Sequence, residues 1–221
     1  MPSAHDLVIF DNDGVLVDSE PIAADVLAHL LNEHGLPTAP EDAMRDFIGA
    51  SMERVRQVSE ARLGGQLPDD FERRYYDALF VRYPGELRAV EGAAFALARI
   101  DLPKCVASSG SLERIRRSLR LVGLWGHFEG RAFSADEVER GKPAPDLFLR
   151  AAEMMGVDPS RCAVIEDSPL GIEAANAAGM TSFGFARRTP AERLRRATGG
   201  LFSDMSQLPQ LLRAPHGPRR G

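Results

Sequence analysis

The alternation of apolar and polar positions divides the chain into short buried strands and amphipathic helices. Short apolar runs bounded by turn residues are typical of buried strands. Such runs lie at residues 8–10, 104–107, 132–134, 162–165, 180–185 and 201–202. Because helical spacing separates most of them, the pattern predicts an α/β fold, in which a parallel sheet carries helices on both faces.

Residues 19–83 differ from the rest of the chain because they show helical spacing and no strand signal. The pattern predicts helices at 19–34, 40–47, 51–63 and 69–83 in this block, and at 92–100, 112–122, 171–178 and 205–212 beyond it. A further helix should open in the stretch 141–146 and end at 156. Ser19 is a candidate cap for the first helix, and Pro84 and Gly85 should end the fourth.

The position of the helical block predicts a discontinuous architecture. Residues 1–18 and 84–221 would form the α/β core, and residues 19–83 would form a cap inserted after the first strand. Linkers near 15–19 and 84–90 would join the two parts, which is the arrangement of a lid hinged over a site. Residues 215–221 are expected to be a disordered tail.

Composition narrows the class of protein. The chain has 221 residues, 44% of them hydrophobic, and a formal net charge of -5, which fits one domain with an insertion. Without an 18-residue apolar run or a basic, signal-like start, we expect no membrane span and a cytoplasmic location. Cys105 and Cys162 are the only cysteines, and they should pack as small apolar groups in strands. The acidic balance argues against nucleic acid as a partner, and we expect a monomer.

Arginines cluster locally within this acidic chain. They are Arg114, Arg116, Arg117 and Arg120, and then Arg187, Arg188, Arg193, Arg195 and Arg196. Helical spacing predicts that both clusters are solvated faces.

Polar side chains gather where predicted strands end. Asp11 and Asp13 close the first strand, and Gly14 permits the turn that follows. The other candidates are Ser108 and Ser109 after the second strand, Lys142 in a turn before a helix, and Glu166 and Asp167 after a later strand. Each has an ordinary structural explanation alone, as a strand exit, a helix cap or a surface lysine. Parallel strands bring these ends to one edge of the sheet, where ligands bind.

Together these residue types suit phosphoryl transfer. That chemistry needs positioning, a divalent metal and fixed positive charge around the transferred oxygens. Mg²⁺ prefers oxygen ligands, and a carboxylate can also serve as the nucleophile and form an aspartyl phosphate.

Four stretches of the chain, in order, resemble the four motifs of the haloacid dehalogenase (HAD) superfamily. The first is Phe10-Asp11-Asn12-Asp13-Gly14-Val15-Leu16-Val17-Asp18-Ser19-Glu20. The others are Ala107-Ser108-Ser109, Gly141-Lys142-Pro143-Ala144-Pro145-Asp146 and Ile165-Glu166-Asp167-Ser168-Pro169-Leu170-Gly171-Ile172. The resemblance covers nearly the whole chain and implies a Rossmann-like core with an α-helical cap inserted after the first motif.

The resemblance also implies a role for each site residue. Asp11 would be the nucleophile, and Asp13 the general acid toward the leaving group and then the general base for water. Ser108, with the backbone N–H of Ser109, would bind the phosphoryl oxygens, and Lys142 would hold Asp11 and the phosphoryl group. Mg²⁺ would be bound by Asp11, the backbone carbonyl of Asp13, and Asp167, with Glu166 supporting through water.

Within the family, Asp13 implies phosphorus chemistry, because the dehalogenases lack this second aspartate. The cap resembles those of β-phosphoglucomutases and small sugar-phosphate phosphatases. Where the mutases carry a histidine and an arginine, this chain has Ala23 and Met52. Arg54 should point about half a helical turn away. Phosphonate hydrolysis needs a cap lysine, and residues 19–83 contain none.

These features favour a Mg²⁺-dependent phosphatase acting on a small phosphorylated sugar or sugar acid. A β-phosphoglucomutase-like mutase and a non-catalytic binding protein on the same fold are the alternatives. Specificity should depend on cap residues near 22–26 and 49–52, and an arginine or asparagine lining the cavity there would favour acidic sugars.

Overall fold

Six parallel strands form one sheet in the computed structural model, which describes residues 4–47 and 49–213. Their order is β3-β2-β1-β4-β5-β6, and every neighbouring pair is parallel. The strands are β1 (Leu7–Phe10), β2 (Lys104–Ser108), β3 (Ala132–Ser134), β4 (Cys162–Glu166), β5 (Thr181–Phe185) and β6 (Gly200–Phe202). The predicted α/β fold is confirmed, and each strand lies within one residue of its predicted bounds.

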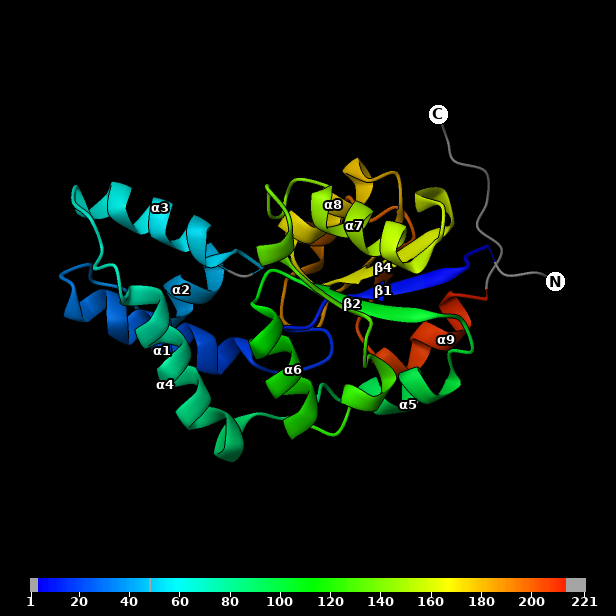
Figure 1. Cartoon of the computed structure of the whole chain (residues 1–221), viewed down its shortest axis with the longest axis horizontal. Coiled ribbons are helices and arrows are strands. Elements are labelled where there is room, and N and C mark those ends of the chain that lie inside the picture. The colour runs from blue at the N-terminus through cyan, green and yellow to red at the C-terminus, as the bar shows by residue number, and fades with distance from the viewer. Residues whose placement is uncertain (1–3, 48, 214–221) are drawn as a thin grey trace.

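Helices cover both faces of the sheet (Figure 1). On one face lie α7 (Asp146–Met155) and α8 (Pro169–Ala177), and on the other α5 (Ala93–Arg99), α6 (Leu112–Leu121) and α9 (Leu208–Leu211). Along β1, Leu7 and Ile9 belong to one buried cluster, whereas Val8 and Phe10 belong to the other. Burial on both faces explains why the strands read as continuous apolar runs.

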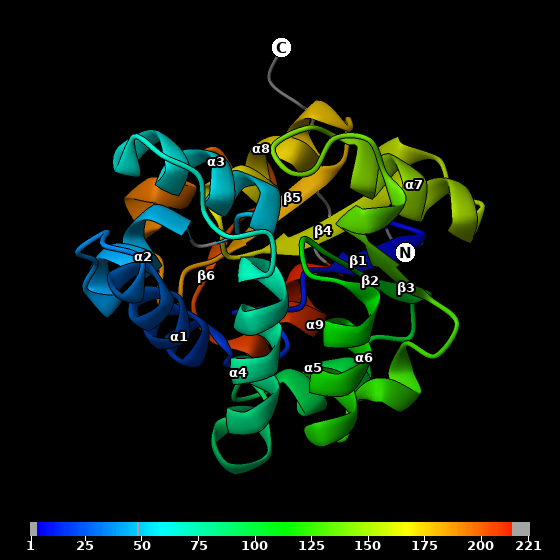
Figure 2. The same cartoon turned by 60° about the vertical axis from the view of Figure 1, so that its left-hand side comes forward.

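Of the five helices described between β1 and β2, the first four form a cap beside the carboxyl ends of the strands (Figures 1 and 2). They are α1 (Glu20–Glu33), α2 (Pro40–Phe47), α3 (Met52–Leu63) and α4 (Phe71–Glu86). The two connections to the core lie side by side, because the backbone N–H of Asp18 donates to the carbonyl of Arg88 at 2.9 Å. We propose residues 18 and 84 as the boundaries between core and cap.

The first connection is also held to the core through the side chain of Asp18. Its carboxylate accepts hydrogen bonds from Arg187 at 3.0 Å and from Arg188 at 2.8 and 2.9 Å. Although burial acts in the opposite direction, the bonds from Arg188 and Arg187 lower the pKa of Asp18 to about 2. Arg187 and Arg188 are exposed, as predicted for a solvated face, and they also pair with Asp18.

Three helix predictions need correction at their ends. Helix α4 continues through Pro84 to Glu86. A proline in the last turn removes only one backbone hydrogen bond, and helical hydrogen bonding resumes after it. Residues 205–212 form a 3₁₀ turn (Met205–Gln207) and then α9, not one helix. Ser19 makes no capping bond at the start of α1, because its backbone is helical and not extended; its hydroxyl donates to Asp13.

The remaining expectations concern cysteines, the tail and membranes. Cys105 and Cys162 are buried and free, as predicted. The predicted tail at 215–221 lies outside the described residues. Over residues 4–47 and 49–213, no helix combines the length and the apolar character needed to cross a membrane.

Candidate active site

The predicted site residues meet at the carboxyl edge of the sheet. Asp11 directly follows β1, Ser108 ends β2, Glu166 ends β4, and Asp167 comes next. Lys142 reaches the same place from the loop before α7. All five side chains are buried. The parallel topology therefore brings together groups that are as much as 156 positions apart (167 − 11) in the sequence.

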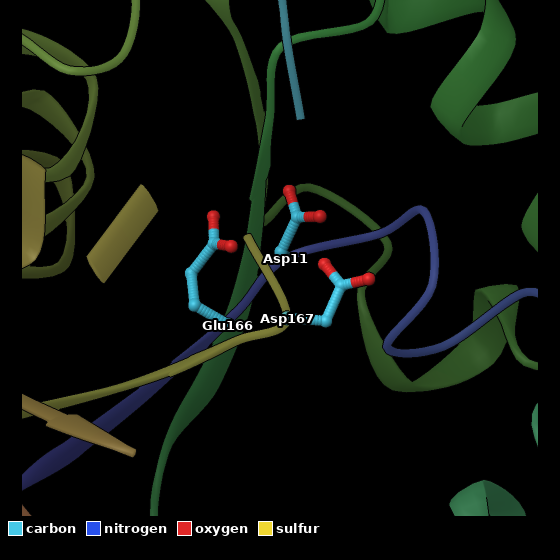
Figure 3. A group of neighbouring side chains, drawn as sticks. All are labelled: Asp11, Glu166 and Asp167. Carbon is cyan, nitrogen blue, oxygen red and sulfur yellow. The ribbon is translucent and has the colours of Figure 1, made fainter. Parts of the chain in front are cut away.

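Asp11, Glu166 and Asp167 form a compact group of carboxylates (Figure 3). One oxygen from each lies within 4.8 Å of the others. Burial raises the pKa of Asp11 to about 8, with Lys142 opposing and Glu166 adding to the shift. Burial, with Glu20 nearby, also raises the pKa of Asp167 above its ordinary value. Three buried carboxylates at this spacing need a cation to be ionised together.

The donor set fits a hard divalent ion. It offers only oxygen atoms, which suits Mg²⁺ and disfavours softer metals. One buried oxygen of this group, Oδ2 of Asp167, has no hydrogen-bond partner among the described residues, and such an oxygen is available to a metal. The arrangement therefore could hold a divalent cation.

Lys142 neutralises part of this negative charge. Its side chain is 1% exposed, and Nζ donates to Asp11 Oδ1 at 2.8 Å, to Glu166 Oε1 at 2.6 Å and to the carbonyl of Ala107 at 3.3 Å. Burial lowers the pKa of Lys142, but the carboxylates of Asp11 and Glu166 outweigh it and hold that pKa above its usual range. A surface role for Lys142 is excluded.

Glu166 is fixed from its other side. Its Oε2 accepts from the backbone N–H of Ser168 at 3.1 Å and from the Ser168 hydroxyl at 2.9 Å. Gly171 lies against the same carboxylate, since a Cβ there would come within 1.9 Å of Oε1. The turn after β4 therefore positions Glu166 as a support for Lys142.

Asp13 has different surroundings from Asp11. Its Oδ1 accepts from Arg114 Nη2 at 2.7 Å and from the hydroxyl of Ser19. The hydroxyl of Ser108 lies 3.4 Å from Oδ2. The two carboxylates that are one residue apart in the sequence thus have separate partners, with Lys142 beside Asp11 and Arg114 beside Asp13.

Two residues of this site were missed by the sequence analysis. Arg114 was predicted to be solvated, but its side chain is only 11% exposed. Glu20 is also buried, and burial raises its pKa to about 7. Gly14 allows Glu20 and Asp167 to approach each other, since a Cβ at Gly14 would lie 2.0 Å from Asp167 Oδ2 and 2.9 Å from the Glu20 carboxyl carbon.

A cavity separates the sheet edge from the cap. The core side contributes Asp11, Asp13, Ser108 and Arg114, and the cap side is mainly apolar, with Tyr75 and Tyr76 as its phenols. The predicted specificity segments are partly confirmed as lining. They contribute Ala23, Ala24, Gly49, Ala50 and Met52 to the lining, whereas the side chains of Ile22 and Val26 are buried among other hydrophobic residues.

The two positions at which mutases carry a histidine and an arginine both lie at the cavity. Ala23 and Met52 line the cavity. Arg54 is exposed and donates to Gln57 at 3.1 Å. Ser109 also contacts the cap here, because its hydroxyl donates to the carbonyl of Gly49 at 3.1 Å.

The sequence and the fold both have relatives among known proteins. The family model described as haloacid dehalogenase-like hydrolase matches residues 5–179. The 6-phosphogluconate phosphatase of Escherichia coli (strain K12) is 30% identical over 213 residues, which cover 96% of each chain. The phosphorylated carbohydrates phosphatase of Thermotoga maritima is 31% identical over 78% of this chain and 81% of that protein. A haloacid dehalogenase-like protein of Agrobacterium tumefaciens has a similar structure, with a TM-score of 0.79, 36% identity and coverage of 94% and 97%.

Proposed function

Since the chain belongs to the haloacid dehalogenase-like hydrolase family and is a phosphatase of that family, we propose that it hydrolyses a small phosphorylated sugar or sugar acid with Mg²⁺, through an aspartyl phosphate. The observation that supports this most directly is the buried group of Asp11, Glu166 and Asp167, with Lys142 paired to the first two of them. Similar proteins named for 6-phosphogluconate and for phosphorylated carbohydrates support the substrate class.

The metal would be held by Asp11, the backbone carbonyl of Asp13, and Asp167, with Glu166 supporting through water. When bound, Mg²⁺ supplies positive charge that offsets the phosphoryl oxygens. The nucleophile is a carboxylate oxygen of Asp11, which forms a bond to phosphorus as the ester P–O bond breaks. Lys142 donates to Asp11 at 2.8 Å and so orients this carboxylate and offsets its charge.

Asp13 carries the proton in both halves of the reaction. Its carboxyl group borders the cavity, where the leaving group of a bound ester would lie. In the first half, Asp13 gives a proton to the leaving alcohol oxygen. In the second half, it takes a proton from the water whose oxygen attacks the aspartyl phosphate, and inorganic phosphate leaves as Asp11 is regenerated.

Turnover is tested on a panel of phosphorylated sugars, sugar acids and an aryl phosphate with Mg²⁺. We expect release of inorganic phosphate from several of them. Interconversion of hexose phosphates without net phosphate release would instead select a mutase, which Ala23 and Met52 disfavour. Metal binding without turnover of any compound would favour a binding protein.

Removal of the metal should have a pH-dependent effect on stability. In the metal-free protein the pKa of Asp11 is about 8, above its ordinary value of 3.8. Between these pH values the folded state holds a proton that the unfolded chain has released, so stability falls as pH rises from about 4 to about 8. Mg²⁺ binding requires ionised carboxylates, and its stabilising effect should therefore grow over the same range.

Thermal unfolding with EDTA and with excess MgCl₂ measures this effect. At one fixed MgCl₂ concentration, chosen as about 100 times Kd near pH 8, Mg²⁺ should add about 2.7 kcal/mol at that pH and raise Tm by about 5–10 °C. The increase should be larger near pH 8 than near pH 5.5. An increase that is equal at both pH values would contradict the proposed ligand set.

A further inference from the structure

Arg114 is the one cationic side chain among the described residues that line the cavity. It lies in the first turns of α6 and reaches the cavity from the core side. Its side chain is 11% exposed, so its charge has lost most of its contact with water. A buried cation requires partners that compensate for this loss.

The partners within the protein use only part of its hydrogen-bonding capacity. A guanidinium has five N–H donors. Arg114 donates from Nη2 to Asp13 at 2.7 Å and from Nε to the hydroxyl of Tyr83 at 3.2 Å, and the Tyr75 hydroxyl is a third partner, which leaves at least two of the five donors. Donors therefore remain for a ligand in the cavity.

The hydrogen bond to Asp13 does not by itself explain why an arginine is buried at this position. The hydroxyl of Ser19 already donates to Asp13 Oδ1, and that of Ser108 lies 3.4 Å from Oδ2. Arg114 has no hydrogen bond or ion pair with Asp11 among the described contacts, and the phosphoryl group belongs beside Asp11. Its place next to Asp13 puts it on the side of the leaving group.

We propose that Arg114 determines substrate specificity by binding a second anionic group, a carboxylate, on the leaving-group part of the substrate. The inference rests on the proposed phosphatase function and narrows its substrates to phosphate esters of sugar acids. A planar guanidinium matches a carboxylate with two parallel hydrogen bonds. The cap wall opposite is largely apolar, and among the described lining residues Arg114 is the one side chain that can pair with an anionic group.

The test compares two esters that differ at one carbon. Gluconate 6-phosphate carries a carboxylate where glucitol 6-phosphate carries a neutral hydroxymethyl group. The preference is the ratio of kcat/KM for the acid to kcat/KM for the neutral ester. Wild type should prefer the acid, and Arg114→Met should lower this ratio about 100-fold. The loss should appear mainly as a higher KM for the acid. Arg114→Lys keeps the charge and should retain part of the preference.

Arg116→Met is the matched control, because Arg116 lies on the same helix but is exposed. It should leave the ratio unchanged. Equal losses on both esters would overturn the inference, since Arg114 would then act through Asp13. An equally weakened inhibition by inorganic phosphate would also overturn it, since Arg114 would then contact the phosphoryl group.

Failure of the proposed function gives a different result. In that case wild type would release phosphate from neither ester, and the inference would be tested by binding alone. Calorimetry of gluconate 6-phosphate and of glucitol 6-phosphate on the Asp11→Asn protein, with and without Arg114→Met, then measures the contact directly. An unchanged affinity would overturn the role of Arg114, and a loss confined to the acid would support it.

Discussion

Replacing Asp11 with Asn should lower phosphatase activity at least about 10⁴-fold, the scale on which loss of a nucleophile acts. The amide keeps the shape of the carboxylate but cannot form the aspartyl phosphate. The fold should persist, because burial already disfavours the charge on Asp11 and raises its pKa to about 8. Phosphate release from the best substrate of the panel, with Mg²⁺ present, is the measurement.

Asp6→Asn is the matched control for this substitution. Asp6 immediately precedes β1, at the opposite edge of the sheet, and is exposed in an ion pair with Arg161 at 2.7 Å. Its replacement should leave activity within about twofold, because exposed ion pairs contribute little. In EDTA, Asp11→Asn should be as stable as wild type or more so, and it should gain less from Mg²⁺. Full activity of Asp11→Asn would remove the assignment of the nucleophile.

The position of the site was predictable because parallel strands have one carboxyl edge. Once the apolar runs fixed the strands, Asp11, Ser108 and Glu166 had to lie together. Hydrophobic periodicity alone could not identify Lys142 as a site residue, because a lysine before a proline is usually a surface residue. The resemblance to a family motif supplied its position, and the 2.6 Å contact with Glu166 explains it.

Arg114 could not be found from helical periodicity. The buried face of α6 is formed by Ile115, Ser118 and Leu119, and Arg114 lies at the border of that face. The helix starts at the edge of the sheet where β2 ends, so its first turns adjoin the site. The site residue could therefore have been found by a different signal. A charged residue in the first turn of a helix that follows a strand ending in site residues lies close to that site.

Ser19 was predicted to cap a helix, but in the structure its hydroxyl donates to a carboxylate. The sequence places it before a helix, where a serine side chain usually accepts from the backbone. The fold also places it beside Asp13, which takes its hydrogen bond instead. The backbone of Ser19 is helical, with φ -92° and ψ -17°, so it lacks the extended conformation in which a cap side chain accepts from the backbone.

Lys142→Met should lower both stability and activity, because Lys142 is the cation inside a group of buried carboxylates. Without it, Asp11 and Glu166 lose their shared partner, and breaking a buried ion pair costs about 3–5 kcal/mol. Activity should fall about 10³-fold, since the charge that orients Asp11 is lost. Denaturant unfolding in EDTA and phosphate release with Mg²⁺ measure the two effects.

The chain supplies its own control, because Lys104 is its only other lysine. Lys104 starts β2 at the opposite edge of the sheet and is half-buried, so Lys104→Met should leave activity unchanged. Adding Glu166→Gln to Lys142→Met removes one unpaired charge and should restore about half of the lost stability but none of the activity. If the double variant regained activity as well, Lys142 would be a structural counter-ion for Glu166 and not a group that orients the nucleophile.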